Sequence, residues 1–438
     1  KIVHCAKIAR CQFLLFFIQI KEIIYMNKKN KFLLFFFTIL LFFNILLFLT
    51  NIWIFDNFGN VKIQEILFTL LSPTSGTDSS VVYSYILRVL LIAVSFTVLS
   101  CFIVLYTRKK SKHFKYIKNI SAIFVVVSLF LSCLYTNSRY DIYGYISQKS
   151  QTTSIYNKSK KTKKKVKKEE YQGDSTIVYQ NPKEINISGS DTNNLIYIYL
   201  ESIENTFLDT AHGGVKAINC MPELTELALN NTSFSNNELL GGAIPFTGTT
   251  WTIASMTSQF TGLPLKVEVA NDMDQQNRFM PGAKTIGDIL NENGYIQELM
   301  IGSQKEFAGT DKLFLQHGFD KICDINSLKQ EYSFKSNELN QWGLDDYKLF
   351  ELAKNEITQL AQTGKFNFTM ATIDCHMPKG FLCKYCPNTY ENRYENIYAC
   401  QSKLINSFID WCKSQSWYEN TTIVLVGDHP TMAQQYVN

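Results

Sequence analysis

Three long apolar stretches of this 438-residue sequence contain no charged residue. They cover residues 32–55, 89–107 and 119–138, and a helix needs about 20 apolar residues to cross a bilayer. A helix buried in the core of a soluble protein rarely runs so far without a charge, which argues against that alternative. We therefore predict an anchor of three transmembrane helices.

The sequence also lacks a basic stripe interleaved with stacking aromatic residues, and its formal net charge is only +5. This excludes nucleic acid as the expected partner. Lysine and arginine are concentrated instead at 28–31 and 108–118, before the first stretch and between the second and third. Basic flanks of membrane helices stay in the cytoplasm, so the chain after residue 138 is predicted to lie on the outer side of a bacterial cytoplasmic (inner) membrane.

Composition divides the chain into four segments. Residues 26–138 form the predicted anchor, and residues 1–25 are expected to be a leader upstream of a natural start at Met26, or else a short amphipathic lead. Residues 139–190 contain a dense lysine block and are predicted to be a flexible linker. That block could be a plain spacer or be attracted to anionic headgroups. Residues 191–438 are the expected catalytic domain.

The catalytic segment alternates apolar strands with helical stretches, which predicts an α/β domain. The predicted strands are residues 195–200, 296–301, 366–373 and 422–426. The predicted helices are residues 224–229, 286–290 and 347–360. In such folds, functional side chains gather at the carboxyl ends of the strands.

Two of these strand ends carry residues that can bind a metal. Glu201 follows the first predicted strand, and Asp428 and His429 follow the last. Two carboxylates and one imidazole suit Zn²⁺ or Mn²⁺. Taken alone, Glu201 could simply cap a helix and the Asp-His pair could form a turn. Their joint position at strand ends favours a metal site.

Four threonines between these strands are candidate nucleophiles: Thr247, Thr249, Thr250 and Thr252. Small and hydroxyl residues at a loop-to-helix junction can place an alkoxide at a helix N-terminus, where backbone N–H groups favour phosphate. A threonine hydroxyl needs a metal or a base to react. Simple helix capping explains the segment equally well, so local chemistry leaves all four candidates open.

Six motifs together resemble the phosphoglycerol transferases, especially the type that decorates periplasmic glucans. Lipoteichoic acid synthases, phosphoethanolamine transferases and sulfatases are more distant members of the same alkaline-phosphatase superfamily. The resemblance covers about residues 190–438 and implies a central mixed sheet flanked by helices. The motifs are NLIYIYLES at 194–202, GTTWTIASM at 248–256, FAG at 307–309, LQHGFD at 315–320, DCHMPKGF at 374–381 and GDH at 427–429.

The resemblance assigns one metal site and one nucleophile. It implies that Glu201, Asp428 and His429 bind one divalent ion, Mn or Zn with Mg as a further possibility, and that the nucleophile is the fourth ligand. Sulfatases place their nucleophile three residues before a serine and ten before a glycine. Thr252 satisfies both spacings and is the predicted nucleophile, with Thr249 or Thr250 as the fallback.

The resemblance also implies residues that contact the substrate. His376 matches a histidine that contacts the phosphate and assists the departing or attacking oxygen. Trp251, Lys305 and Lys312 are further candidates for substrate binding. The two lysines are candidates because Thr310 stands where related enzymes carry an arginine or a lysine. His317 is expected to be structural, as its motif fits a packed turn.

Cysteines form a separate pattern. Cys386 and Cys400 match cysteines of the glucan-modifying enzymes, which implies a disulfide outside the cytoplasm. Cys383 and Cys386 form a Cys-x-x-Cys pair that could instead be a redox or zinc pair. The sequence lacks a second such pair, which weakens that alternative.

The resulting functional hypothesis is transfer of phosphoglycerol from phosphatidylglycerol to an extracytoplasmic glycan, glucan or polyol through a phospho-threonine intermediate. Phosphoethanolamine transfer or sulfatase-type hydrolysis is the enzymatic alternative, and a non-catalytic membrane scaffold is the other. Related enzymes continue well beyond the residue that matches His429, so a C-terminally truncated domain is expected. The sequence does not indicate an oligomeric state.

Overall fold

A computed structural model describes most of the chain. The described residues are 28–59, 61–71, 79–110, 114–147, 193–235, 238–265, 278–433 and 436–437. They form two compact units, one containing the long helices up to Phe55 and from Ser79 to Tyr143, the other containing Asp56–Asp78 and the chain from Gly144 onward. The predicted leader and most of the predicted linker, with its lysine block, lie outside the described residues.

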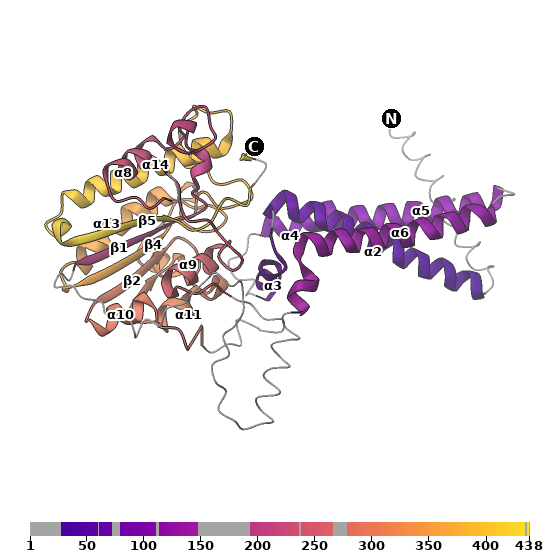
Figure 1. The fold of residues 1–438 in the computed structure, drawn as a ribbon, viewed down its shortest axis with the longest axis horizontal. Coiled ribbons are helices and arrows are strands. Elements are labelled where there is room, and N and C mark those ends of the chain that lie inside the picture. Colours follow the sequence, from indigo (N-terminus) through magenta and orange to yellow (C-terminus); the bar gives the residue numbers. More distant parts are fainter. Residues whose placement is uncertain are drawn as a thin grey trace, which may run out of the picture. The chain divides into compact units, whose positions relative to one another are not determined.

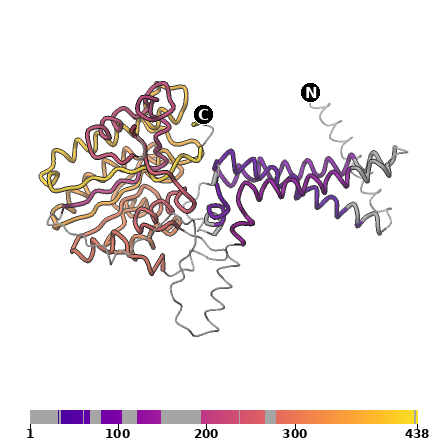
Figure 2. The backbone as a smooth tube through the Cα atoms, in the orientation of Figure 1, coloured from indigo at the N-terminus to yellow at the C-terminus, as the bar shows by residue number. Residues whose placement is uncertain are grey.

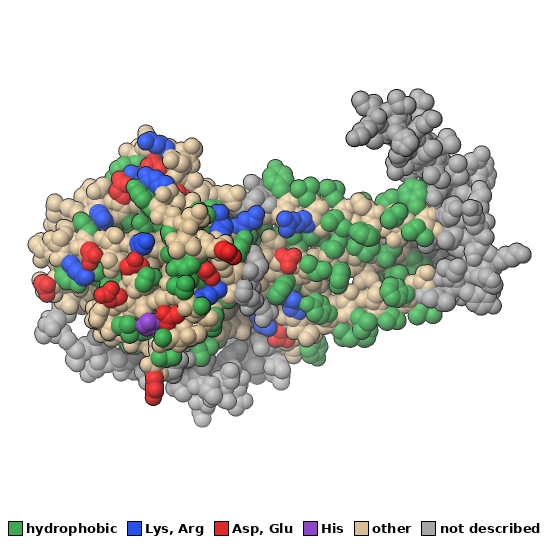
Figure 3. Space-filling view, turned by 90° about the horizontal axis from the view of Figure 1, so that it is seen from above, with side chains coloured by type: hydrophobic (Ala, Val, Ile, Leu, Met, Phe, Trp, Pro, Cys, Tyr) green, Lys and Arg blue, Asp and Glu red, His purple; other side chains and the backbone are tan. Residues whose placement is uncertain are grey.

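The first unit is helical (Figure 1). Its elements are α2 (Lys28–Phe58), α4 (Ser79–Tyr85), a π-helical turn (Ile86–Leu90), α5 (Leu91–Lys110) and α6 (Phe114–Tyr140). Three segments are long and apolar enough to cross a membrane: Phe35–Phe58, Val81–Ile103 and Ser121–Tyr140. Figure 3 shows hydrophobic side chains gathered on the visible face of these helices.

The second of these segments begins earlier than the sequence indicates. The expected start was residue 89, directly after Arg88, whereas the apolar segment begins at Val81 and the helix continues through Arg88. One arginine need not end such a helix, because its long apolar stem can lie along the helix while the charged head reaches a polar surface.

Polar side chains join α2 to its neighbours within this unit. Asn44 donates to the Ser128 hydroxyl at 2.6 Å and accepts from the Ser132 hydroxyl at 2.9 Å. One and a half to two turns further along, Asn51 donates to Thr136 at 2.8 Å. Such hydrogen bonds hold helices together in an apolar environment, where helix association has no hydrophobic driving force. They fix the pairing of α2 with α6.

The second unit is built on a five-stranded sheet with the order β3-β2-β4-β1-β5. Every pairing between its strands is parallel, so the α/β domain is confirmed, and the expected mixed sheet is parallel throughout the described residues. Figure 2 shows β1 and β5 running side by side although they come from opposite ends of the domain. The strands are β1 (Asn194–Leu200), β2 (Ile296–Ile301), β3 (Lys321–Cys323), β4 (Phe366–Ala371) and β5 (Thr421–Gly427).

Helices cover both faces of this sheet, with α8, α13 and α14 on one side and α9, α10 and α11 on the other (Figure 1). Their bounds are α3 (Ile63–Leu71), α8 (Pro222–Asn230), α9 (Thr252–Thr261), α10 (Ile286–Glu292), α11 (Thr310–Leu315), α12 (Ile325–Glu331), α13 (Asp346–Leu360) and α14 (Arg393–Lys413). Short 3-10 turns occupy Asn205–Phe207, Thr210–His212, Phe307–Gly309, Ser336–Glu338 and Tyr418–Asn420.

Successive side chains of β1 enter different cores, because strand side chains alternate between faces. Ile196 and Ile198 pack with residues of α13 and α14, such as Phe408. Tyr199 packs on the other face with residues of α9, such as Ile253. A parallel sheet covered on both faces needs apolar residues at nearly every position, which is why its strands read as continuous apolar runs.

Candidate active site

The active site begins where β1 and β5 end. Leu200 pairs with Gly427 in parallel register, so Glu201 and Asp428 leave neighbouring strands at the same level. Gly427 permits this close arrangement, because a Cβ atom there would lie 2.2 Å from the carbonyl oxygen of Ile203. The expectation that strand ends deliver both carboxylates to one place therefore has a direct structural basis.

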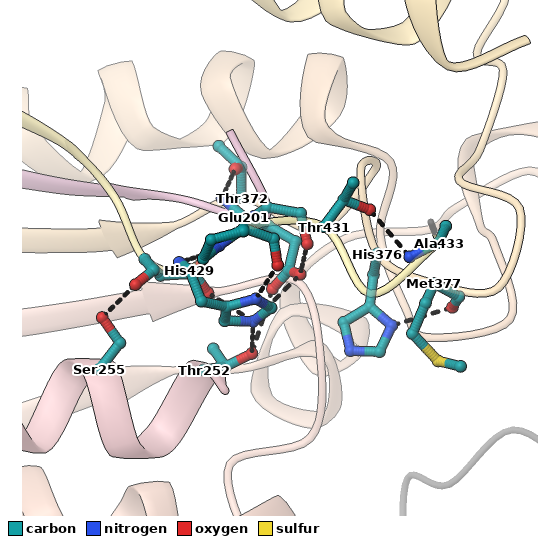
Figure 4. A network of polar contacts seen from close by, with 12 residues as sticks. Glu201, Thr252, Ser255, Thr372, His376, Met377, His429, Thr431 and Ala433 are labelled. Atoms are coloured by element: carbon teal, nitrogen blue, oxygen red, sulfur yellow. Dashed lines mark hydrogen bonds and ion pairs between the residues drawn. The ribbon is translucent and has the colours of Figure 1, made fainter. Parts of the chain in front are cut away.

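Glu201, Asp428 and His429 form one buried group of possible metal ligands. One ligand atom from each lies within 4.8 Å of the others. His429 Nε2 is 3.7 Å from Glu201 Oε1 and 3.4 Å from Asp428 Oδ2. Figure 4 shows Glu201 and His429 converging with Thr252 at the end of the sheet. The spacing suits one small ion held between them.

The surroundings of this group fit a divalent cation. Asp428 Oδ1 accepts from the backbone N–H groups of Ser202 and His429, but Oδ2 is buried without a hydrogen-bond partner. Burial and the neighbouring Glu201 carboxylate raise the pKa of Asp428 from 3.8 to about 7. His429 Nδ1 is 2.9 Å from the Pro430 carbonyl, which accepts a hydrogen bond from Nδ1–H and leaves Nε2 as the nitrogen that can bind a metal. A bound cation would supply the positive charge needed to balance the two buried carboxylates.

Thr252 completes the group. It is the first residue of α9, and its hydroxyl lies 3.2 Å from Glu201 Oε2 and 3.3 Å from His429 Nε2. The Ser255 hydroxyl, one turn later, donates to the backbone carbonyl of Asp428. Gly262 ends α9 with a left-handed φ of 73°. The spacing of Thr252, Ser255 and Gly262 therefore marks the start, the anchor and the end of one helix.

The other candidate threonines point elsewhere. Thr249 donates to the Phe246 carbonyl at 2.9 Å, which makes it part of a local turn. Thr250 donates to Glu65 at 2.8 Å. Thr247 is exposed. Of the four threonines, Thr252 is the one whose hydroxyl contacts the ligand group.

Glu65 was not identified from the sequence. It lies in α3, between the first and second apolar segments, and is 7% exposed. Burial raises the pKa of Glu65, although the hydrogen bond from Thr250 lowers it. The only signal in the sequence is a single carboxylate inside a short apolar helix, and nothing in that signal points to a loop nearly two hundred residues later.

His376 lies on the loop that follows β4, beside the ligand group (Figure 4). Its Nδ1 is 3.0 Å from the Met377 carbonyl, so Nδ1 carries the proton of the neutral ring and Nε2 is the nitrogen with the lone pair. Its ring packs against Trp342, with 4.3 Å between ring centroids, and Trp342 in turn contacts Phe307 at 5.7 Å. Trp342 was missed, because its partners are distant in sequence.

The remaining predicted site residues have mixed positions. Trp251 is buried and immediately precedes α9. Lys305 lies in the loop after β2, and Lys312 lies in α11. Their role as phosphate ligands stays a prediction. Thr310 donates to the Phe307 carbonyl at 2.9 Å and closes a turn. His317 is buried, and its ring nitrogens contact Asp288 and the Phe279 carbonyl, as expected of a structural residue.

The cysteines differ from the expectation. All nine described cysteines are free, so the structure contains no Cys386–Cys400 disulfide. Cys383 Sγ lies between the two, 3.6 Å from Cys400 Sγ and 3.7 Å from Cys386 Sγ. The sequence resemblance could not foresee this, because it paired two cysteines and left out the third that folding brings beside them.

The chain is similar to several known proteins. Phosphoglycerol transferase I of Citrobacter koseri is 31% identical over 256 residues, a match that covers 56% of this chain and 32% of the relative. The chain thus spans about a third of the length of the curated relatives it matches. A Vibrio parahaemolyticus protein of the alkaline phosphatase superfamily has a TM-score of 0.45 at 21% identity, covering 56% of each chain.

A lipoteichoic acid synthase from Listeria monocytogenes has a TM-score of 0.44 at 20% identity, and the match covers 55% of this chain and 57% of the other. The sulfatase family profile matches residues 193–436, which include β1, Thr252, the three residues of the ligand group and β5. The chain therefore belongs to the sulfatase family of the alkaline-phosphatase superfamily.

Proposed function

We propose that this protein is a membrane-anchored, metal-dependent transferase that moves phosphoglycerol from phosphatidylglycerol to an extracytoplasmic glycan or polyol. One observation carries the proposal: the Thr252 hydroxyl, at the start of α9, lies within 3.3 Å of two buried residues of the ligand group. The name of the Citrobacter relative supports the choice of phosphoglycerol as the group transferred.

Different residues of the proposed site would bind the metal ion and react with the substrate. Glu201, Asp428 and His429 would hold one divalent ion, Mn²⁺ or Zn²⁺, with Thr252 as the fourth ligand. Such an ion, when bound, lowers the pKa of the hydroxyl and offsets charge on the phosphoryl oxygens. The Thr252 hydroxyl donates toward Glu201, so a carboxylate is already placed where the hydroxyl proton must leave.

The first half-reaction forms the bond between Thr252 Oγ and phosphorus and breaks the bond between phosphorus and the diacylglycerol oxygen. The proton lost by Thr252 ends on the diacylglycerol that departs. The N-terminus of α9 favours the negative phosphoryl group, because its backbone N–H groups point toward it. His376 would contact the phosphate and exchange a proton with the departing oxygen.

The second half-reaction regenerates the enzyme. An acceptor hydroxyl attacks the phosphorus of phosphoglycerol-Thr252, the Oγ–phosphorus bond breaks, and the proton of the acceptor returns to Thr252. Transfer rather than hydrolysis requires that a sugar or polyol hydroxyl reaches the site before water does. The three apolar helices would keep the site near a donor that stays in the bilayer, which raises the effective donor concentration.

A labelled-lipid experiment tests this function. Purified full-length protein in detergent is supplied with Mn²⁺ or Zn²⁺ and phosphatidylglycerol labelled in the headgroup glycerol, with glucan or glycerol as acceptor. We expect diacylglycerol release and transfer of label to the acceptor, both abolished by Thr252→Ala. Transfer from phosphatidylethanolamine instead, or label released only as free glycerol phosphate, would assign the site to the other enzymatic classes.

A further inference from the structure

A second group of metal-binding side chains lies outside the active-site ligand group. Cys383 and Cys386 sit on the loop after β4, and Cys400 lies in α14. The three Sγ atoms lie within 4.8 Å of one another. Among the described residues, no fourth His, Cys, Asp or Glu belongs to this group. We call these three residues the thiol cluster.

The distances within the thiol cluster match metal coordination. Cys383 Sγ lies 3.6 Å from Cys400 Sγ and 3.7 Å from Cys386 Sγ. Two sulfurs bound to one tetrahedral Zn²⁺ at 2.3 Å are separated by about 3.8 Å. A disulfide would need about 2.05 Å between two of them and would leave the third thiol unused. One ion between the three sulfurs would be coordinated by all of them.

Backbone hydrogen bonds around Cys383 stabilise its thiolate and fold the segment that carries it. The backbone N–H of Tyr385 donates to Cys383 Sγ at 3.4 Å, and the N–H of Cys386 donates to the Cys383 carbonyl at 3.1 Å. The Cys-x-x-Cys segment is thereby folded so that both of its sulfurs face the same side. Cys383 and Cys400 are buried against Tyr347, whereas Cys386 is partly exposed.

We propose that Cys383, Cys386 and Cys400 bind a thiophilic divalent cation such as Zn²⁺ at a site separate from the active site. The three thiolates occupy three tetrahedral positions, and water from the partly exposed Cys386 side takes the fourth. The oxygen and nitrogen ligands of the active site suit a harder ion, so the two sites differ in metal preference.

The position of the thiol cluster gives the bound ion a structural role. Cys383 lies seven positions after His376 on the same loop, and Cys400 is on a helix that packs on the sheet. An ion at the thiol cluster therefore ties the His376 loop to α14. In the oxidising conditions outside a cytoplasm, a disulfide between two of these cysteines is the competing state, and the experiment below separates the two.

Metal analysis of full-length protein purified in detergent without reductant tests the proposal. Asp428→Asn removes an active-site ligand and so lowers the zinc content of that site, and the cysteine variants then show where the retained zinc is bound. We expect about one zinc per chain in Asp428→Asn. Adding Cys386→Ala should remove that zinc, whereas adding Cys412→Ala, a buried α14 cysteine outside the cluster, should leave it.

A spectroscopic measurement on the unmutated cysteines guards against misfolded variants. X-ray absorption of the Asp428→Asn protein should find three sulfur neighbours around zinc at about 2.3 Å. Three results would each overturn the proposal. The first is a peptide map in which two of the three cysteines are joined by a disulfide. The second is a zinc content that Cys386→Ala does not change, and the third is zinc surrounded only by oxygen and nitrogen.

Discussion

At the scale of single residues, the active site concentrates two carboxylates in a buried space. Asp428 is 6% exposed and Glu201 is 3% exposed, and Asp428 Oδ2 has no protein donor. Two carboxyl groups this close cannot both ionise without a large electrostatic cost unless a cation lies between them. The same physics makes metal binding at this site a competition with protons.

Metal affinity should rise with pH. Asp428 has its pKa raised to about 7, and the neighbouring carboxylates raise the pKa of His429 although burial lowers it. Both groups must lose their protons to bind an ion, so protons outcompete metal below about pH 7. Calorimetric titration with Mn²⁺ between about pH 6 and pH 8 measures this. Mn²⁺ is chosen because the thiolates of the thiol cluster should bind it only weakly.

Two variants control this titration. Asp428→Asn should weaken Mn²⁺ binding and flatten its pH dependence, because the group that takes up the competing proton is gone. Gln64→Ala changes a residue of α3 that is not part of the ligand group, and it should leave the titration unchanged. An affinity that stays constant over the whole pH range would contradict the coupling.

Glu65→Ala should lower the rate of transfer without removing the metal. The hydrogen bond from Thr250 to Glu65 holds the loop two residues before Thr252, the proposed nucleophile. Losing one such bond to a charged acceptor costs about 1.5–3 kcal/mol, which corresponds to a drop of roughly tenfold to a hundredfold if it acts on the position of Thr252. Steady-state kinetics with Gln64→Ala as the control measures this, and equal rates for both variants would exclude a positioning role for Glu65.

Single residues also mark the limit of sequence-based prediction at the site. Local chemistry could not choose among the threonines, because a hydroxyl at a helix start looks the same whether it caps or reacts. The fold separates them by giving each hydroxyl a different partner. Glu65 and Trp342 could not be foreseen, because their roles depend on contacts with segments distant in sequence.

At the scale of elements, the long apolar strands were predictable and the shorter or more polar elements were not. β2 was predicted with its observed bounds, and β1, β4 and β5 within two residues. β3 has only three residues, too few to show a pattern. α14 was not predicted, because it buries polar side chains such as Asn396, Gln401 and Ser402 that interrupt the apolar periodicity.

The end of β5 has room only for glycine. Gly427→Ala would place a Cβ atom 2.2 Å from the Ile203 carbonyl, so the strand end must shift and carry Asp428 with it. We expect a loss of about 1–3 kcal/mol in unfolding free energy together with weaker metal binding. Thermal unfolding with and without Mn²⁺ measures both effects.

Gly282→Ala provides the matched control, because nothing lies within 4 Å of the added Cβ and the backbone there is not left-handed. It should unfold and bind metal as the unaltered protein does. If Gly427→Ala behaved like Gly282→Ala in both measurements, the tight fit between the strand end and the ligand group would be refuted.

At the scale of the whole molecule, the three apolar helices and the sulfatase-family domain imply a division between anchor and catalyst. The basic residues at 28–31 and 108–118 predict which side of the membrane the domain occupies. The early start of the second apolar segment at Val81 keeps three crossings and so leaves this prediction unchanged.

Protease access tests the predicted topology. Trypsin cleaves after lysine and arginine, and residues 159–168 are rich in lysine. Added to intact spheroplasts, trypsin should digest the chain after residue 138, whereas the same region should be protected in inverted membrane vesicles. A cytoplasmic marker protein controls for leakage. Protection in spheroplasts and digestion in inverted vesicles would reverse the orientation.

The central claim is that Thr252 becomes covalently attached to phosphoglycerol. The most direct measurement is mass spectrometry of the purified protein after incubation with phosphatidylglycerol and metal, without an acceptor. The account predicts one phosphoglycerol adduct per chain, mapped to Thr252, absent in Thr252→Ala and lost when an acceptor is added. An adduct on Thr249 or Thr250 would contradict the assignment of the nucleophile, and no adduct with Mn²⁺ or Zn²⁺ would contradict the mechanism.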